Sequence, residues 1–195
     1  MKQRPPYQWL ADLGSIILVL FVVAAYRLFP AVTPSWAFTL AALLAIAVLV
    51  AIGTELYLMF RAYRAGQFFP MRNASFFVLM LSLVGLPLYL LYAWASGAYL
   101  GPATLLLVPV FLTLTTRNLF RVQLDSLSLR AKTGFRSPRE VALFNIQDVR
   151  VEDDKIVVLP DGGDPPIQLL RVFFFPAHWE AIRSRLATIR GSGTP

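Results

Sequence analysis

The uncharged, mainly apolar run from Ala37 to Gly53 restricts the fold of this chain more than any other feature. A helix needs about 20 mainly apolar residues to cross the hydrocarbon core of a bilayer, and about 17 is the lower limit. Hydrophobic residues make up 57% of the sequence, which exceeds the share of about 45–50% in soluble domains. The sequence therefore predicts a membrane protein that crosses the bilayer several times.

Four stretches have the apolarity expected of membrane spans. The predicted spans cover about residues 9–29, 36–59, 74–94 and 99–115. The third contains Pro87 and the fourth contains Pro109, and spans tolerate proline because neighbouring helices satisfy the carbonyl groups that it frees. The first stretch also resembles a signal peptide, but no small-residue cleavage site follows it before Arg27. We therefore expect a retained helix.

The basic residues predict the orientation of these spans. The connection after the second span contains Arg61, Arg64 and Arg72, whereas residues 30–35 and 95–98 contain no charge. Lys and Arg are enriched in the cytoplasmic connections of membrane proteins. Both termini are therefore expected in the cytoplasm, which agrees with an even number of spans.

The residue pattern changes at Thr115–Arg121. Beyond it, apolar and polar residues alternate in short runs, as in Phe120, Val122 and Leu124, and turn-forming residues separate the runs. A period of two is typical of strands. The end of the chain instead shows apolar residues at helical spacing: Trp179, Ile182, Leu186 and Ile189. We therefore expect short antiparallel strands followed by one amphipathic helix.

These patterns divide the chain into three predicted parts. Residues 1–116 form a four-span transmembrane domain, residues 117–191 form a cytoplasmic domain, and residues 192–195 form a flexible tail. Frequent turns between short strands favour a small antiparallel sandwich or barrel. The predicted fold class is thus an α+β membrane protein in which a C-terminal helix closes the sheet domain.

The segment Leu127–Asp153 contains a strand, a turn at Gly134, a basic stretch and an apolar pair, followed by Ile146-Gln147-Asp148-Val149. This order resembles that of the bacterial membrane-flanked pleckstrin-homology-like (PH-like) domains, over about residues 117–190 and the two preceding spans. The resemblance implies a PH-like fold, attachment to a bacterial cytoplasmic (inner) membrane, and a role in interaction or regulation. The first two spans are an addition to the usual layout of that family.

Lys132, Arg136 and Arg139 form a basic predicted turn, and Arg117 and Arg121 are near it in sequence. Eukaryotic relatives of the PH fold bind inositol phosphates with a similar segment, since several cations can converge on one phosphate cluster. We therefore treat these five residues as candidates for binding lipid headgroups. The spacing of Arg136 and Arg139 differs from the usual basic pair, so nonspecific attraction to anionic lipid and simple solvation are alternatives.

Asp12, Arg27 and Glu55 are the ionisable residues within the predicted spans. Charges inside a membrane are candidates for function because central placement costs about 2.5–3.5 kcal/mol on insertion scales. All three lie toward span ends, where this cost is smaller. We therefore expect Glu55 to pair with Arg61 or Arg64, while a transport or proton-relay role is the alternative.

Small residues four apart on the second span permit close approach of another helix. The candidates for helix packing are Ala37, Ala41, Ala45, Ala47 and Ala51. We expect packing within this protein, and docking of another membrane subunit is the alternative.

The sequence contains no cysteine and one histidine, His178. These leave no familiar nucleophile or metal constellation, and we expect His178 to lie at the surface near a helix end. No cofactor and no metal are predicted, and the net charge of +7 is explained by basic residues flanking spans, without a nucleic-acid partner. We predict a non-catalytic interaction or regulatory protein that contacts membrane lipids and a membrane-protein partner or a second copy. The alternatives are a small transporter or channel and an anionic-lipid-binding protein.

Overall fold

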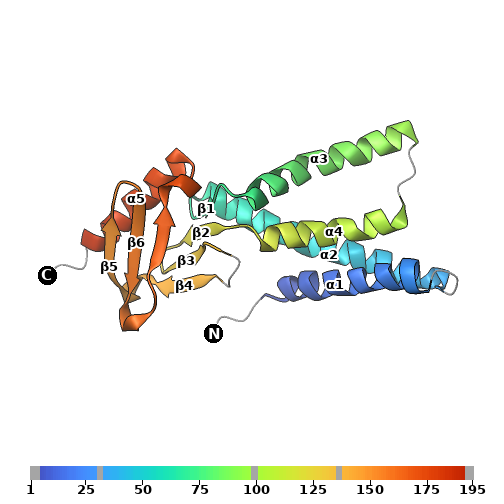
Figure 1. Ribbon diagram of the computed structural model, residues 1–195, viewed down its shortest axis with the longest axis horizontal. Helices are drawn as coiled ribbons and strands as arrows, with labels where there is room; N and C mark the ends of the chain where they lie inside the picture. The colour runs from blue at the N-terminus through green and yellow to red at the C-terminus, as the bar shows by residue number, and fades with distance from the viewer. Residues whose placement is uncertain (1–4, 30–32, 98–100, 135–137, 192–195) are drawn as a thin grey trace. The chain divides into compact units, whose positions relative to one another are not determined.

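The computed structural model describes residues 5–29, 33–97, 101–134 and 138–191 (Figure 1). The chain forms two compact units. The first combines Met1–Phe60 with Val78–Arg117, and the second combines Arg61–Phe77 with Asn118–Pro195. The architecture is α+β, with helices in the first unit and two antiparallel sheets in the second.

The first unit is helical. Its elements are α1 (Pro6–Val23) with the π-helical extension η1 (Ala24–Leu28), α2 (Ser35–Arg64), α3 (Ala74–Ser96) and α4 (Pro102–Arg117). Three stretches are long and apolar enough to cross a membrane: α1 with η1, α2, and α3. The fourth, α4, is also apolar, but its 16 residues rise only about 24 Å, which is less than the hydrocarbon thickness of about 30 Å.

Helices α1, α2 and α4 share a small apolar core. It consists of Leu18, Ala41, Ala45, Val48, Leu106 and Val110. Ala51 is also buried, while Ala37 and Ala47 are half-buried. The small side chains of α2 therefore lie toward its neighbours within this chain. In contrast, only 6% of the most apolar window of α3 is buried, which suits a surface that faces lipid.

Gly14 of α1 is a packing position that can be tested. An added Cβ would overlap the Cγ2 atom of Val48 on α2. Gly14→Ala is therefore expected to destabilise the helical unit by about 1–3 kcal/mol, the usual cost of overpacking. Gly53→Ala is the matched control because its Cβ would meet nothing within 4 Å. Thermal unfolding in detergent, followed by circular dichroism, checks both; equal midpoints for the two variants would contradict the packing argument.

The second unit contains two antiparallel sheets. Sheet A has the strand order β1 (Phe68–Pro70), β2 (Arg121–Leu124), β3 (Ser128–Lys132) and β4 (Arg139–Ala142). Sheet B has the order β5 (Ile146–Val151), β6 (Lys155–Pro160) and β7 (Ile167–Leu170). Short 3-10 turns follow β4, β6 and β7: η2 (Leu143–Asn145), η3 (Asp161–Gly163) and η4 (Arg171–Phe173).

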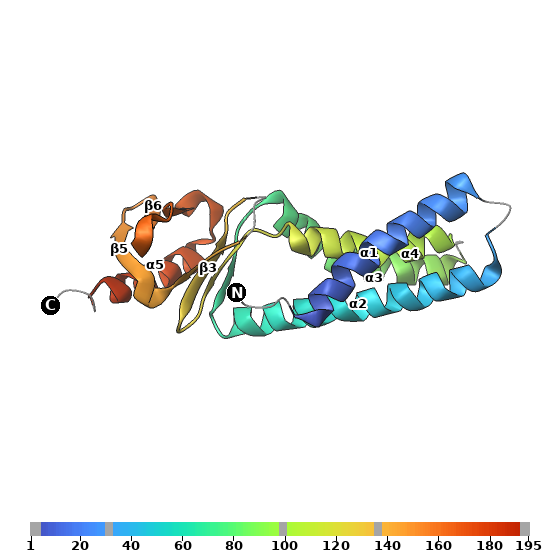
Figure 2. The same ribbon diagram turned by 90° about the horizontal axis from the view of Figure 1, so that it is seen from below.

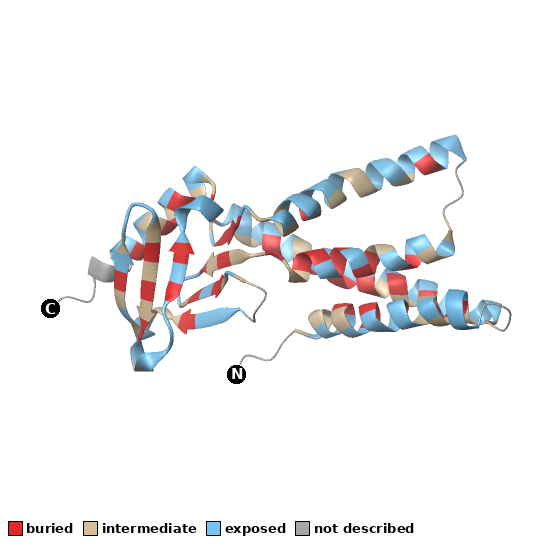
Figure 3. Cartoon of the chain, in the orientation of Figure 1, coloured by how far each residue is buried: buried red, intermediate tan, exposed pale blue. Residues whose placement is uncertain are grey.

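The final helix, α5 (Pro176–Gly191), packs against β5 (Figure 2). Buried residues alternate with half-buried ones along β6 and with exposed ones along β7 (Figure 3), as expected when one face of a sheet is covered. One core joins both sheets to α5 through Trp179, Ile182 and Leu186, all fully buried. The predicted terminal helix is therefore present, and these three apolar residues enter the sheet core.

The expected domain boundary requires a correction. Residues 61–77 were expected to lie within the transmembrane domain 1–116, as a connection and the start of the third span, but the structure assigns them to the second unit. Strand β1 pairs antiparallel with β2, with Phe68 opposite Gln123 and Pro70 opposite Arg121. Phe69 and Met71 enter the sheet core, so the second unit is assembled from two segments that α3 and α4 separate in sequence.

Candidate functional site

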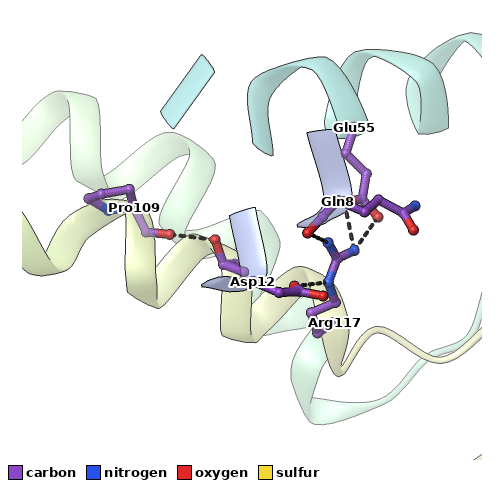
Figure 4. Close-up of polar contacts among 6 residues, drawn as sticks. Gln8, Asp12, Glu55, Pro109 and Arg117 are labelled. Carbon is purple, nitrogen blue, oxygen red and sulfur yellow. Dashed lines mark hydrogen bonds and ion pairs between the residues drawn. The ribbon is translucent and has the colours of Figure 1, made fainter. Parts of the chain in front are cut away.

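Arg117, the last residue of α4, is the centre of an ion network in the helical unit (Figure 4). Its Nη1 donates to both carboxylate oxygens of Glu55 on α2, at 2.6 and 2.7 Å. Its Nε donates to Oδ1 of Asp12 on α1 at 2.7 Å, and its Nη2 donates to the carbonyl oxygen of Gln8 at 3.4 Å. One guanidinium therefore joins three helices.

The local structure explains this arrangement. Arg117 lies at the C-terminal end of α4, where the helix dipole favours a positive charge. Glu55 is only 3% exposed, and a buried carboxylate is stable in its charged form only when it is paired and hydrogen-bonded. The planar guanidinium presents several donors in a fixed geometry and can therefore satisfy two carboxylates at once.

The charges of this network do not balance. With both Asp12 and Glu55 ionised, two negative charges face the single positive charge of Arg117. The guanidinium of Arg117 therefore serves one carboxylate on α1 and another on α2.

Hydroxyl groups lie close to the network in sequence. Ser15 is one helical turn beyond Asp12, and Thr116 precedes Arg117; both hydroxyls are buried and have no hydrogen-bond partner in the structure. Thr113 donates its hydroxyl to the carbonyl oxygen of Pro109 at 2.8 Å (Figure 4), which is a common arrangement for threonine within a helix. Buried polar side chains of the helical unit are thus concentrated around Arg117.

The structure brings together two of the three intramembrane candidates. Asp12 and Glu55 meet at Arg117, whereas Arg27 lies exposed on η1. The expected pairing of Glu55 with Arg61 or Arg64 is wrong, because the carboxylate of Glu55 binds Arg117. The sequence did contain a signal for this contact: in the predicted topology, the cytoplasmic ends of the first, second and fourth spans carry Asp12, Glu55 and Arg117.

Four of the five lipid-headgroup candidates lie among the described residues. Arg117 belongs to the ion network of the first unit, while Arg121 and Lys132 are partners across β2 and β3 in the second. Arg139 on β4 donates to the carbonyl oxygens of Pro165 and Pro166, at 3.3 and 3.4 Å. The fifth candidate, Arg136, lies outside the described residues.

His178 lies in the first turn of α5, as expected of a helix-end histidine, and is half-buried among aromatic rings rather than exposed at the surface. Ring centroids of Phe175, Tyr63 and Phe69 lie 5.4, 5.6 and 5.9 Å from its own, in edge-to-face arrangements. Burial lowers the pKa of His178 below its ordinary value, because a low-dielectric environment disfavours the charged ring. The imidazole is therefore a neutral packing element of the second unit at pH 7.

Within the described ranges, no group of three or more His, Cys, Asp or Glu side chains is arranged to hold a metal ion. Comparison with protein-family models, curated proteins and solved structures gives no match for this chain.

Proposed function

We propose that the second unit is a PH-like domain and that the protein is a non-catalytic membrane protein in which this domain binds a partner protein. Short antiparallel strands closed by one C-terminal helix support this assignment, as does the order of features from Leu127 to Asp153. In this proposal, α3 and α4 form a membrane hairpin inserted between the first two strands of the domain, and α4 is the fourth span. Both termini are then cytoplasmic.

The exposed apolar pair Leu127 and Phe144 is the observation that carries the proposal. They are 72% and 85% exposed; Leu127 immediately precedes β3, and Phe144 lies in the turn η2 that follows β4. The two residues lie close together, because the amide of Leu143 donates to the carbonyl oxygen of Leu127 at 2.9 Å. Large apolar residues exposed side by side mark protein-binding surfaces, and aromatic residues often contribute most of the binding energy.

The backbone beside this pair also suits binding. Phe144 follows β4, which is an edge strand of sheet A among the described residues. An edge strand has unpaired amide and carbonyl groups that can accept a strand of a partner. The spans confine the domain to a membrane, so a partner in that membrane meets it at high effective concentration. The proposed partner is therefore another membrane protein, for which this chain is an accessory subunit.

Replacing both residues with serine is expected to abolish partner binding. The Leu127→Ser/Phe144→Ser variant removes the apolar surface without disturbing a buried contact, so the protein should fold normally but bind at least about tenfold more weakly. Leu170→Ser is the matched control, since Leu170 is an exposed apolar residue on strand β7 of the same unit. The measurement is the stoichiometry of proteins retained on native nanodiscs that contain each tagged variant. Retention of the same partner by the double variant would refute the proposed surface.

The ion network favours a second candidate function, that of a small transporter or channel. Glu55 is a buried carboxylate on a candidate membrane span, and ionisable residues in such positions often mark ion or proton pathways. Proton flux into liposomes that contain the purified protein tests this function. Flux that Glu55→Gln abolishes supports it, whereas liposomes no leakier than protein-free ones exclude it.

A further inference from the structure

The turn η4 exposes two apolar side chains in the second unit. Val172 is 71% exposed and Phe173 is 42% exposed. They immediately follow Arg171, which is also exposed. Water solvates such an exposed apolar pair poorly. Strand β7, which precedes the turn, alternates between buried and exposed residues.

Hydrogen bonds place this turn beside the start of a candidate membrane span. The amide of Arg72 donates to the carbonyl oxygen of Phe173 at 2.7 Å. Arg72 lies two residues before Ala74, the first residue of α3. All of these residues belong to the second unit, so their proximity is a property of that unit alone.

The first turn of α3 is also fixed in this unit. The side chain of Asn73 accepts a hydrogen bond from the amide of Phe76 at 3.1 Å and thereby caps the helix. The ring of Phe76 lies 5.6 Å from that of Phe175, in an edge-to-face contact. The first turn of α3 therefore contacts the chain that follows η4.

Charge completes a pattern typical of membrane interfaces. The guanidinium of Arg72 lies 5.4 Å from the centroid of the Phe175 ring, and Arg72 is exposed like Arg171. Arginine side chains at a bilayer surface reach lipid phosphates, while adjacent apolar and aromatic residues enter the boundary of the acyl chains. Two arginines and two exposed apolar residues thus gather where a span begins.

We propose that Val172 and Phe173 insert into the interfacial layer of the bilayer at the start of α3, with Arg72 and Arg171 at the level of the phosphates. The occupant of this surface is anionic lipid, because both arginines attract phosphate and α3, a candidate membrane span, begins two residues after Arg72. These four residues therefore form a lipid contact of the second unit. The inference does not depend on whether Leu127 and Phe144 bind a partner.

Single labels in the full-length protein can test this surface, since the sequence contains no cysteine. Val172→Cys and, as a matched control, Phe144→Cys are each labelled with an environment-sensitive fluorophore in nanodiscs that contain anionic phospholipid. Nitroxide groups attached near the headgroups should quench the label at position 172 several-fold more than the label at position 144. Aqueous iodide should show the opposite preference.

The arginines are tested in the same labelled protein. Arg72→Gln with Arg171→Gln should weaken nitroxide quenching at position 172, and the loss should be greatest in anionic nanodiscs, because these cations attract phosphate. Equal iodide quenching at positions 172 and 144, with no nitroxide effect, would overturn the proposal. Protection of position 172 from both quenchers would also overturn it and assign the surface to a protein.

Discussion

Replacement of Arg117 by methionine is expected to destabilise the helical unit by about 3–5 kcal/mol, the usual result of removing one partner from a buried ion pair. Methionine retains much of the arginine stem but none of its donors. Glu55 would then remain 3% exposed with no cation beside it. Because burial of an unpaired carboxylate is far more costly than burial of a neutral acid, Glu55 must take up a proton or the helices must separate.

A variant in which all three side chains are neutral tests whether the network serves only to stabilise the helical unit or also binds a proton. Asp12→Asn, Glu55→Gln and Arg117→Met together remove every charge while approximately preserving volume. If the network only joins the helices, the triple variant should recover most of the stability lost by Arg117→Met, since well-packed neutral residues often replace buried ion pairs at little cost. Reversible unfolding in mixed micelles, followed by circular dichroism, measures the difference.

Arg27→Met provides the control for arginine removal. Arg27 lies exposed on η1, and surface arginines contribute little to stability. Its replacement should leave the unfolding midpoint nearly unchanged. If Arg117→Met unfolded at the same midpoint as Arg27→Met, the contacts of Arg117 with Glu55 and Asp12 would not stabilise the fold.

Asp12 and Glu55 show how much of this site can be predicted from the sequence. Ionisable residues within apolar helices are unusual, so composition alone identifies them as candidates. The sequence does not specify which helices are neighbours, and the choice of partner depends on that packing. The nearest arginines in the chain, Arg61 and Arg64, were therefore preferred over Arg117, although Arg117 is the partner in space.

Strand β1 is a part of the fold that could not be predicted from the sequence. Longer strands such as β6 show a periodic pattern, with Ile156 and Val158 buried and their neighbours half-buried. Strand β1 has three residues, and all of them are buried. Such a short apolar segment between two spans has no period to detect, and it therefore resembled part of the membrane connection.

The pairing of β1 leads to the second large expected effect. Residues 118–191 alone should not fold, because the sheet core would lack Phe69 and Met71 and the unit would also lose the buried Phe68; all three are at most 5% exposed. Burial of each such side chain contributes about 1.5–3 kcal/mol. Their combined loss is comparable with the total stability of about 5–15 kcal/mol of a typical domain. The fragment should therefore aggregate on expression.

Excision of the hairpin should instead give a folded domain. Residues 61–73 would be joined to residues 118–191 by a short Gly/Ser turn, which is feasible because Met71 donates its amide to the carbonyl oxygen of Phe120 at 3.0 Å. Two strands joined in this way form an ordinary β-hairpin. The excised protein should unfold cooperatively and show the near-ultraviolet circular dichroism of an ordered Trp179, which is fully buried in the core.

A pair of variants of the excised protein isolates the role of β1. Phe69→Ser removes a ring that is 3% exposed and should abolish cooperative unfolding, since large buried aromatic residues contribute about 3–5 kcal/mol. Gln67→Ser changes an exposed residue next to the same strand and should have little effect. A fragment of residues 118–191 that is as stable as the excised protein would contradict the pairing of β1 with β2. If the excised protein alone is stable, the membrane hairpin is an insertion that the sheet domain tolerates, and the domain can be studied without its spans.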